Sequence, residues 1–244
     1  MIKFSVVIPI YDEEGSVEPL YLSLKSVMDR MKEPYEIIFV NDCSRDGSLQ
    51  ALKNIDAAPA HLTIVSLRRH SGQSAALQAG FDAARGETII TIDGDLQNDP
   101  GDIPCLLDKI KSGYDVVCGW RYDRKDPWHK IAASRIANLV CRIAAREKIH
   151  DTGCTLRVFK RSVLKDVRLS ENMHRFFTLI MARRGYSIGE VKVSHSRRKS
   201  GKSKYGILNR LGWVTDLIRI AGSDMDDLMR QGNGYEIEEI IRRR

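Results

Sequence analysis

Two aspartates, Asp93 and Asp95, stand one residue apart at the end of an apolar run of strand length. The run, residues 88–92, is rich in β-branched side chains and predicts a strand that is buried on both faces. Two carboxylates at such a strand end repel each other unless a cation or a hydrogen-bonding ligand lies between them. Their oxygens suit Mg²⁺ or Mn²⁺, ions that keep part of their shell for substrate phosphates. A helix cap beside a solvated carboxylate would also explain an isolated pair.

Acidic and polar side chains also follow two other predicted strands. Residues 3–9 are followed by Tyr11, Asp12, Glu13 and Glu14, and residues 35–40 are followed by Asn41, Asp42 and Ser44. The carboxyl ends of parallel strands meet at one edge of a sheet, where ligands bind. A carboxylate such as Asp42 can accept a hydrogen bond from a nucleobase N–H, as Asp12 or Glu14 can from a base or ribose. Each side chain taken singly is better explained as a helix cap, but taken together they predict one site.

The elements that must position these side chains alternate regularly. Strands are predicted at residues 3–9, 35–40, 61–66, 88–92 and 114–118, with helices at 16–31, 47–56, from Gly72 and at 100–111. Ala75, Ala76, Ala79 and Ala83 allow the third of these helices to pack closely. This alternation predicts an α/β fold with a mostly parallel, doubly wound sheet flanked by helices.

The pattern changes beyond Gly119. Residues 119–130 read as a charged loop, residues 131–146 as an Ala-rich helix, residues 155–161 and 186–195 as added strands, and residues 172–184 as a helix between them. From Gly206, apolar residues recur at helical spacing. We therefore divide the chain into a catalytic domain, residues 1–205, and an amphipathic helix with a polar, partly disordered tail, residues 206–244. The helix suits core packing or a membrane surface.

Composition narrows the class of protein. The 244 residues can bury the core of one α/β domain, and the net charge of +7 implies an anionic partner. The basic segment SRRKSGKSKYG contains one aromatic residue, Tyr205, whereas a nucleic-acid reader more often interleaves stacking aromatics with its charges. This favours a phosphorylated substrate or an anionic membrane surface over nucleic acid, and a solvated basic loop would also explain the segment.

Location and redox state are predicted by what the sequence lacks. No apolar run reaches the roughly 18 residues of a transmembrane helix, and the first residues do not form a signal peptide. We expect a cytoplasmic protein. The five cysteines show neither a C-x-x-C pair nor zinc-finger spacing, so reduced thiols are expected.

Six segments, in this order, resemble a known family: SVVIPIYDEEGS, EIIFVNDCSRDGS, HSGQSAALQAGF, TIDGDLQNDP, DTGCTLRVFKR and GKSKYG. From about Ser5 to Leu217 the chain is similar to the family 2 glycosyltransferases. It looks most like the polyprenyl-phosphate branch, which includes dolichyl-phosphate mannose synthases and undecaprenyl-phosphate sugar transferases. The resemblance implies a GT-A fold, a nucleotide-sugar donor, and Mg²⁺ or Mn²⁺ as cofactor.

The resemblance also implies roles for single residues. The family's nucleotide-contacting positions correspond to Pro9, Tyr11, Glu13 and Asp42. Its metal and diphosphate site corresponds to Asp93, Asp95 and Gln97. The groups that hold the donor and acceptor phosphates in the family correspond to Arg121, Lys130 and Ser134. The family's mobile basic loop corresponds to the segment with Arg197, Ser203 and Lys204. Asp151 takes the place of an acidic residue near the acceptor. The catalytic residues implied are Asp95, Arg121 and Asp151, although a solvated Arg121 or a capping Asp151 stays open.

Two segments depart from the family pattern. Asp12-Glu13-Glu14 replaces Asn-Glu-Glu, and Asn41-Asp42-Cys43-Ser44 replaces Asp-Asp-Gly-Ser, which leaves UDP against GDP open. Many bacterial relatives carry C-terminal transmembrane helices that this sequence lacks. Membrane attachment is left to the helix from Gly206, to a partner, or to residues beyond this sequence.

The function expected from the resemblance is inverting transfer of a sugar to a polyprenyl phosphate. The enzyme would lie peripherally at the inner face of the plasma membrane, and a homo-oligomer is compatible with the sequence. Because a lipid phosphate is already largely dianionic, Asp151 would orient it more than deprotonate it. One alternative is transfer to a saccharide or another hydroxyl group. Another is a non-catalytic, membrane-associated protein that binds nucleotide sugars.

Overall fold

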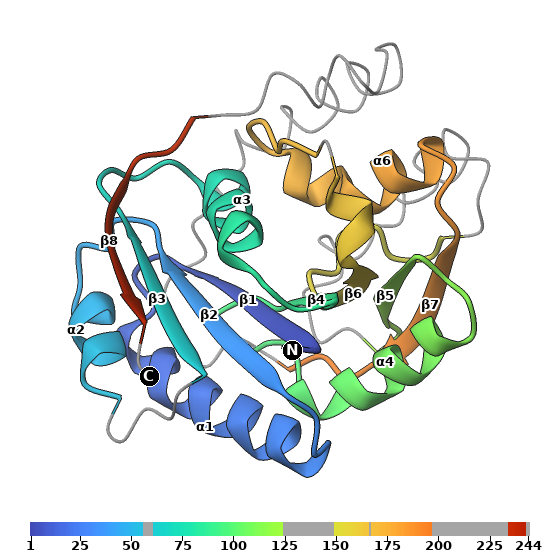
Figure 1. The fold of residues 1–244 in the computed structure, drawn as a ribbon, viewed down its shortest axis with the longest axis horizontal. Coiled ribbons are helices and arrows are strands. Elements are labelled where there is room, and N and C mark those ends of the chain that lie inside the picture. The colour runs from blue at the N-terminus through green and yellow to red at the C-terminus, as the bar shows by residue number, and fades with distance from the viewer. Residues whose placement is uncertain (56–60, 124–148, 166, 197–233, 243–244) are drawn as a thin grey trace.

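The structure, a computed structural model, describes residues 1–55, 61–123, 149–165, 167–196 and 234–242. Its centre is an eight-stranded sheet with the order β7-β5-β6-β4-β1-β2-β3-β8 (Figure 1). The strands are β1 (Phe4–Ile10), β2 (Tyr35–Asn41), β3 (Leu62–Leu67), β4 (Thr88–Thr91), β5 (Val116–Arg121), β6 (Arg157–Lys160), β7 (Ile188–Val193) and β8 (Ile237–Arg242). The α-helices are α1 (Glu14–Arg30), α2 (Ser48–Lys53), α3 (Gln73–Ala83), α4 (Ile103–Lys111) and α6 (Phe177–Arg183). Short 3₁₀ helices are η1 (Pro100–Asp102), η2 (Arg161–Leu164) and η3 (Met173–Phe176).

Strand direction confirms the predicted mostly parallel sheet. β1 pairs in parallel with β2 and β4, β2 with β3, and β5 with β7. Only β6 and β8, among the described strands, run against the others. The carboxyl ends of β1 to β4 therefore lie on one edge of the sheet, as the argument from strand ends requires.

Helices cover both faces of the sheet. α1, α2 and α4 lie on one face, and α3 and α6 lie on the other (Figure 1). Side chains of β1 alternate between two cores: Val6 and Ile8 pack with Val17 of α1, while Val7 packs with Phe177 of α6. Burial on both faces explains why these strands read as nearly continuous apolar runs.

Close packing of α3 against the sheet agrees with its small side chains. A Cβ atom on Gly80 would lie 2.3 Å from Val7 Cγ1, so no larger residue fits there without movement. Ala75, Ala76 and Ala79 are buried beside it. This approach brings the N-terminal end of α3 close to the carboxyl ends of β1 and β4.

Two predictions near the sheet edges are wrong. β5 runs to Arg121, so Gly119, Trp120 and Arg121 belong to a strand rather than to a charged loop. The reason is tertiary, because these three residues pair with Val191, Lys192 and Val193 of β7.

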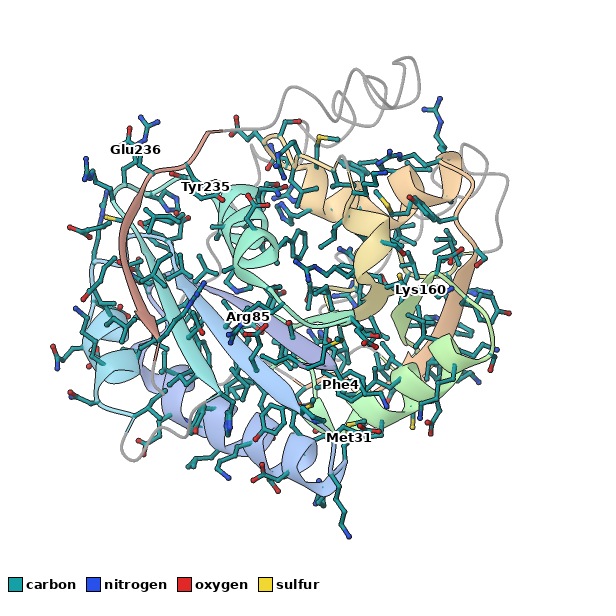
Figure 2. The ribbon with its side chains drawn as sticks, in the orientation of Figure 1. Phe4, Met31, Arg85, Lys160, Tyr235 and Glu236 are labelled. Atoms are coloured by element: carbon teal, nitrogen blue, oxygen red, sulfur yellow. The ribbon has the colours of Figure 1, made fainter. Side chains whose placement is uncertain are left out.

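The tail is the second correction, because its last described residues form β8 against β3 instead of a disordered segment. Tyr235 lies beside α3, where its hydroxyl donates to Asp82 (2.7 Å), and Glu236 points away from the sheet (Figure 2). The helix predicted at residues 172–184 is also divided, into η3 and α6.

Several predictions lie outside the described residues. These are the helix at residues 131–146, the amphipathic helix from Gly206, and the site residues Lys130, Ser134, Arg197, Ser203 and Lys204. Within the described residues no helix is long and apolar enough to cross a membrane.

Candidate active site

The edge formed by the carboxyl ends of the parallel strands is hollowed by a cavity of about 330 Å³. Its lining includes residues that the sequence predicted for one site: Pro9, Tyr11, Glu13, Asp42, Asp93 and Asp95. The structure thus brings together the ends of β1, β2 and β4. Gln97, Arg121 and Asp151 do not line this cavity.

Asp42, at the end of β2, is almost completely buried. Backbone N–H groups of Ser71 and Gly72 donate to its two oxygens (2.7 and 2.8 Å), and His70 Nδ1 lies 2.8 Å from Oδ2. Burial raises the pKa of Asp42, while the two N–H donors and His70 act in the opposite direction. The carboxylate therefore sits in a site built by the segment that follows β3.

Tyr11 and His70 form a second feature of this end of the cavity. Their rings stack with centroids 4.0 Å apart and an angle of 24° between the planes. Glu13, which lines the same cavity, is buried, and its backbone N–H donates to Ser48 Oγ (2.8 Å). A flat aromatic surface beside a buried carboxylate is suited to a heterocyclic base.

Asp93 and Asp95 lie in the loop after β4. Gln73 Nε2 donates to Asp93 Oδ1 (2.7 Å), and the backbone N–H of Gln97 donates to Asp95 Oδ1 (3.1 Å). Burial, and then the charge of Asp95, raise the pKa of Asp93 to about 6. Leu96 adopts a left-handed conformation with φ of 61°, which costs an ordinary side chain roughly 1–2 kcal/mol. The loop thus holds two repelling carboxylates on a strained backbone.

These two carboxylates fit a divalent cation of the Mg²⁺ or Mn²⁺ kind. Their repulsion and burial are the conditions that a bound cation relieves. In the described part of the chain, no group of three or more His, Cys, Asp or Glu side chains could hold a metal ion. One or two carboxylates, completed by water and substrate phosphates, are the usual protein contribution to a Mg²⁺ site.

Arg121 and Asp151 form a buried pair on the β5 side. Arg121 Nε and Nη2 donate to the two oxygens of Asp151 at 2.7 and 2.9 Å, and the Arg121 side chain is 16% exposed. This two-point contact fixes the guanidinium plane. Gly153 lies against the pair, because a Cβ on it would be 3.3 Å from Arg121 Nη2. Arg121 is therefore an ordered strand-end side chain rather than a solvated loop residue.

Gln97 joins this loop to the segment after β7. Ser196 N–H donates to the Gln97 carbonyl (2.9 Å), and Gln97 Nε2 donates to the Ser196 carbonyl (3.3 Å). Asn98 and His195 form an isolated β-bridge beside this contact. The residue directly before the predicted basic loop is thus tied to the loop that carries Asp93 and Asp95.

Sequence reasoning missed four residues whose polar side chains line the cavity: His70, Gln73, Asn172 and His174. His70 and Gln73 follow β3, so the strand-end argument applied to a further strand would have found them. Asn172 and His174 carry no such signal, because they follow β6 and reach the cavity only through packing of η3 on α3.

A sequence profile described as glycosyl transferase family 2 matches residues 5–168. The chain belongs to glycosyl transferase family 2. The matched range contains the ends of β1 to β5 and therefore all the described site residues from Pro9 to Asp151. Arrangement of the family 2 residues around one cavity agrees with this assignment.

The names of the curated relatives describe enzymes that transfer sugars to lipid phosphates. The chain is 40% identical over 225 residues to dodecaprenyl-phosphate galacturonate synthase of Rhizobium johnstonii, covering 90% of this chain and 66% of the relative. It is 35% identical over 215 residues to undecaprenyl-phosphate 4-deoxy-4-formamido-L-arabinose transferase of Aeromonas hydrophila, covering 88% and 66%. The chain thus spans just under two thirds of the length of these relatives.

Solved structures confirm the GT-A fold. Glucosyl-3-phosphoglycerate synthase of Mycobacterium tuberculosis, in complex with Mn²⁺, UDP and phosphoglyceric acid, superposes with a TM-score of 0.72 at 17% identity. The match covers 91% of this chain and 80% of that one. The same enzyme with Mn²⁺, UDP-glucose and glycerol 3-phosphate gives a TM-score of 0.69 at 18% identity, covering 90% and 78%.

Proposed function

We propose that this family 2 protein transfers a sugar from a uridine diphosphate sugar to a polyprenyl phosphate, with inversion at the anomeric carbon. The observation that carries the proposal is that Asp93 and Asp95 line the same cavity as Asp42 and the stacked rings of Tyr11 and His70. The 40% identity to a dodecaprenyl-phosphate galacturonate synthase supports the acceptor class.

Hydrogen-bond capacity at Asp42 supports uracil over guanine. Asp42 Oδ2 already meets Gly72 N–H and His70 Nδ1, while Oδ1 accepts only the Ser71 N–H among the described contacts. A carboxylate oxygen has about two lone-pair sites, so Oδ1 retains room for one more donor. Uracil presents a single N3–H, whereas guanine presents two adjacent donors that need both oxygens. UDP is therefore the donor nucleotide we propose.

Asp93 and Asp95 would hold Mg²⁺ or Mn²⁺. A cation bound there supplies charge stabilisation to the departing diphosphate. The chain's own contribution is to hold the two carboxylates on the loop after β4, where Gln73 Nε2 donates to Asp93 Oδ1 and the Gln97 N–H donates to Asp95 Oδ1. Fixed groups of this kind need no reorganisation during the reaction.

Arg121 would contact a phosphate, with Asp151 as its positioning residue. Both oxygens of Asp151 accept from Arg121, so this carboxylate is committed to holding the guanidinium. A polyprenyl phosphate, with its second pKa of about 6, is an adequate nucleophile without a general base. The arrangement therefore suits a phosphate acceptor better than a hydroxyl acceptor, which would need Asp151 as a base.

The predicted basic loop, with Arg197, Ser203 and Lys204, lies outside the described residues, as do Lys130 and Ser134. Its attachment through Ser196 to Gln97 supports a role in holding phosphates near the metal loop. We propose that the protein works peripherally at the inner face of an anionic membrane, where its net charge of +7 favours binding. A homo-oligomer stays a prediction.

Transfer assays test this function. Purified protein with Mn²⁺ is incubated with UDP-sugars and GDP-sugars, with and without a short polyprenyl phosphate. The expected result is transfer that requires both a UDP-sugar and the lipid phosphate. Transfer only to a hydroxyl acceptor would contradict the acceptor, and preference for a GDP-sugar would contradict the base.

A further inference from the structure

The main cavity has further polar lining residues besides those of the base recess and the carboxylate pair. These are Gln73, Asn172 and His174. A second cavity of about 300 Å³ shares all three, together with His70 and Gly72. The three residues therefore form a wall shared by the two cavities, and the recess along this wall belongs to the cavity that Asp93 also lines.

His174 is fixed on three sides. Its backbone N–H donates to Ser74 Oγ (3.3 Å), its carbonyl accepts from Arg157 Nη1 (2.9 Å), and its Nδ1 lies 2.9 Å from Ser74 Oγ. The Ser74 hydroxyl can accept the backbone N–H and also donate its proton to Nδ1, and we assign this arrangement because it satisfies both groups of Ser74. The ring proton of His174 then resides on Nε2.

The imidazole of His174 is neutral. His174 is 5% exposed. Burial, and then the nearby cations Arg175 and Arg157, lower the pKa of its imidazole to about 3. The ring lines both cavities, and Nε2 has no hydrogen-bond partner among the described residues. Because no described residue occupies Nε2, this atom can donate to a ligand oxygen in the cavity that His174 lines.

Position identifies which part of a nucleotide sugar this recess would meet. Tyr11, His70 and Asp42 occupy the base end, and Asp93 with Asp95 occupies the diphosphate end. Gln73 joins the carboxylates to this wall, because its Nε2 donates to Asp93 Oδ1 (2.7 Å). A group attached beyond the diphosphate would therefore lie within reach of Gln73 and the residues beside it.

We propose that Gln73, Asn172 and His174 form the subsite for the transferred sugar, with His174 Nε2–H donating to a sugar oxygen. This inference rests on the proposed function and names residues that discriminate among sugars. Neutral donors and amides suit hydroxyl or carboxylate oxygens of a sugar, whereas a cationic site would compete for the phosphates.

Asn172 supplies a test that leaves the core intact. It has a left-handed φ of 63°, a conformation that glycine adopts without strain, so Asn172→Gly removes only the side chain. Lys32→Gly is the matched control, because Lys32 has a φ of 55° and lies at the end of α1, away from the cavity.

The experiment compares the affinities of UDP and UDP-galacturonic acid, by calorimetry with Mn²⁺, in four proteins: wild type, His174→Leu, His174→Gln and Asn172→Gly. His174→Leu and Asn172→Gly are expected to lower the affinity for UDP-galacturonic acid about tenfold, as for loss of one hydrogen bond. The affinity for UDP should fall less than about twofold. His174→Gln keeps an N–H near the Nε2 position and is expected to recover part of the loss.

The outcomes separate the two proposals. Equal weakening of UDP and UDP-galacturonic acid binding, or unchanged affinity for both ligands in Asn172→Gly and His174→Leu, would overturn the sugar subsite and leave the proposed function standing. Failure of the wild type to bind UDP at all would overturn the proposed function and this inference with it. Melting temperatures of all variants, with Lys32→Gly as reference, show whether a loss comes from unfolding.

Discussion

Asp42 follows β2 and Asp93 follows β4, the two strands that flank β1 in the sheet, yet the groups around the two carboxylates differ. Burial raises the pKa of both. Around Asp42 the protein supplies two backbone N–H groups and His70, which oppose that rise. Beside Asp93 it supplies another carboxylate, which adds to it. One end of the cavity is thus completed by the chain, and the other is left for a cation and its phosphates.

The backbone is strained after both groups of carboxylates. Cys43, directly after Asp42, and Leu96, directly after Asp95, both lie in the left-handed region, with φ of 55° and 61°. Each left-handed residue has some conformational cost, and at the second turn the backbone N–H of Gln97 donates to Asp95 Oδ1. We therefore expect substitutions at the metal end to abolish catalysis and those at the base end to weaken binding.

The largest effect is expected from Asp95→Asn. Loss of one carboxylate from the pair should lower transfer at least about a hundredfold, because charge stabilisation of the diphosphate is lost. Measurement is by transfer rate at saturating Mn²⁺. Asp108→Asn is the matched control, since Asp108 is exposed on α4 and pairs only with Lys111 among the described contacts. Normal turnover by Asp95→Asn would refute the metal assignment.

Arg121→Lys should have the next largest effect. Lysine keeps the charge but cannot make the two-point contact with Asp151, so the phosphate-binding group loses its orientation. We expect a fall in kcat of about tenfold, with the affinity for UDP nearly unchanged. A variant that loses UDP affinity instead would place Arg121 in the nucleotide site.

Asp42→Asn tests the completed end. The amide offers one acceptor oxygen where Ser71 and Gly72 now meet two, so one buried N–H loses its partner. We expect a loss of about 1–3 kcal/mol in the free energy of unfolding and roughly tenfold weaker UDP binding. Urea unfolding and calorimetry measure the two. Unchanged UDP affinity would remove Asp42 from the base recess.

Mn²⁺ should stabilise the wild type but not Asp95→Asn. A ligand at a hundred times its dissociation constant contributes about 2.7 kcal/mol to folding. Melting temperature with and without Mn²⁺, in the presence of UDP, measures the difference. An equal rise in both proteins would show that the cation binds elsewhere.

The smallest effect is expected from Cys43→Gly. Glycine removes the left-handed strain at φ of 55° but increases the freedom of the unfolded chain, and the two nearly cancel. We expect a change of less than about 1 kcal/mol in the free energy of unfolding, with UDP affinity unchanged. A marked loss of affinity would show that the Cys43 side chain shapes the base recess.

Strand-end reasoning anticipated much of this site. Asp42, Asp93 and Asp95 follow long apolar runs, and the parallel order of those runs brings their ends together. The reasoning failed where pairing partners are distant in sequence. Arg121 read as a loop residue because only the register with β7 extends β5 to it. Residues 237–242 read as a polar tail because their hydrogen-bond partner is β3, far earlier in the chain.

By itself, the sequence determined the alternation of strands and helices, the mostly parallel sheet and the acidic edge, because hydrophobic period and strand ends are local properties. Only the tertiary structure decided the environment of each charge. The N–H groups that hold Asp42, the arginine that engages Asp151 and the serine that fixes His174 all come from other elements. Burial and hydrogen-bond partners depend on packing across the fold, and no local pattern encodes them.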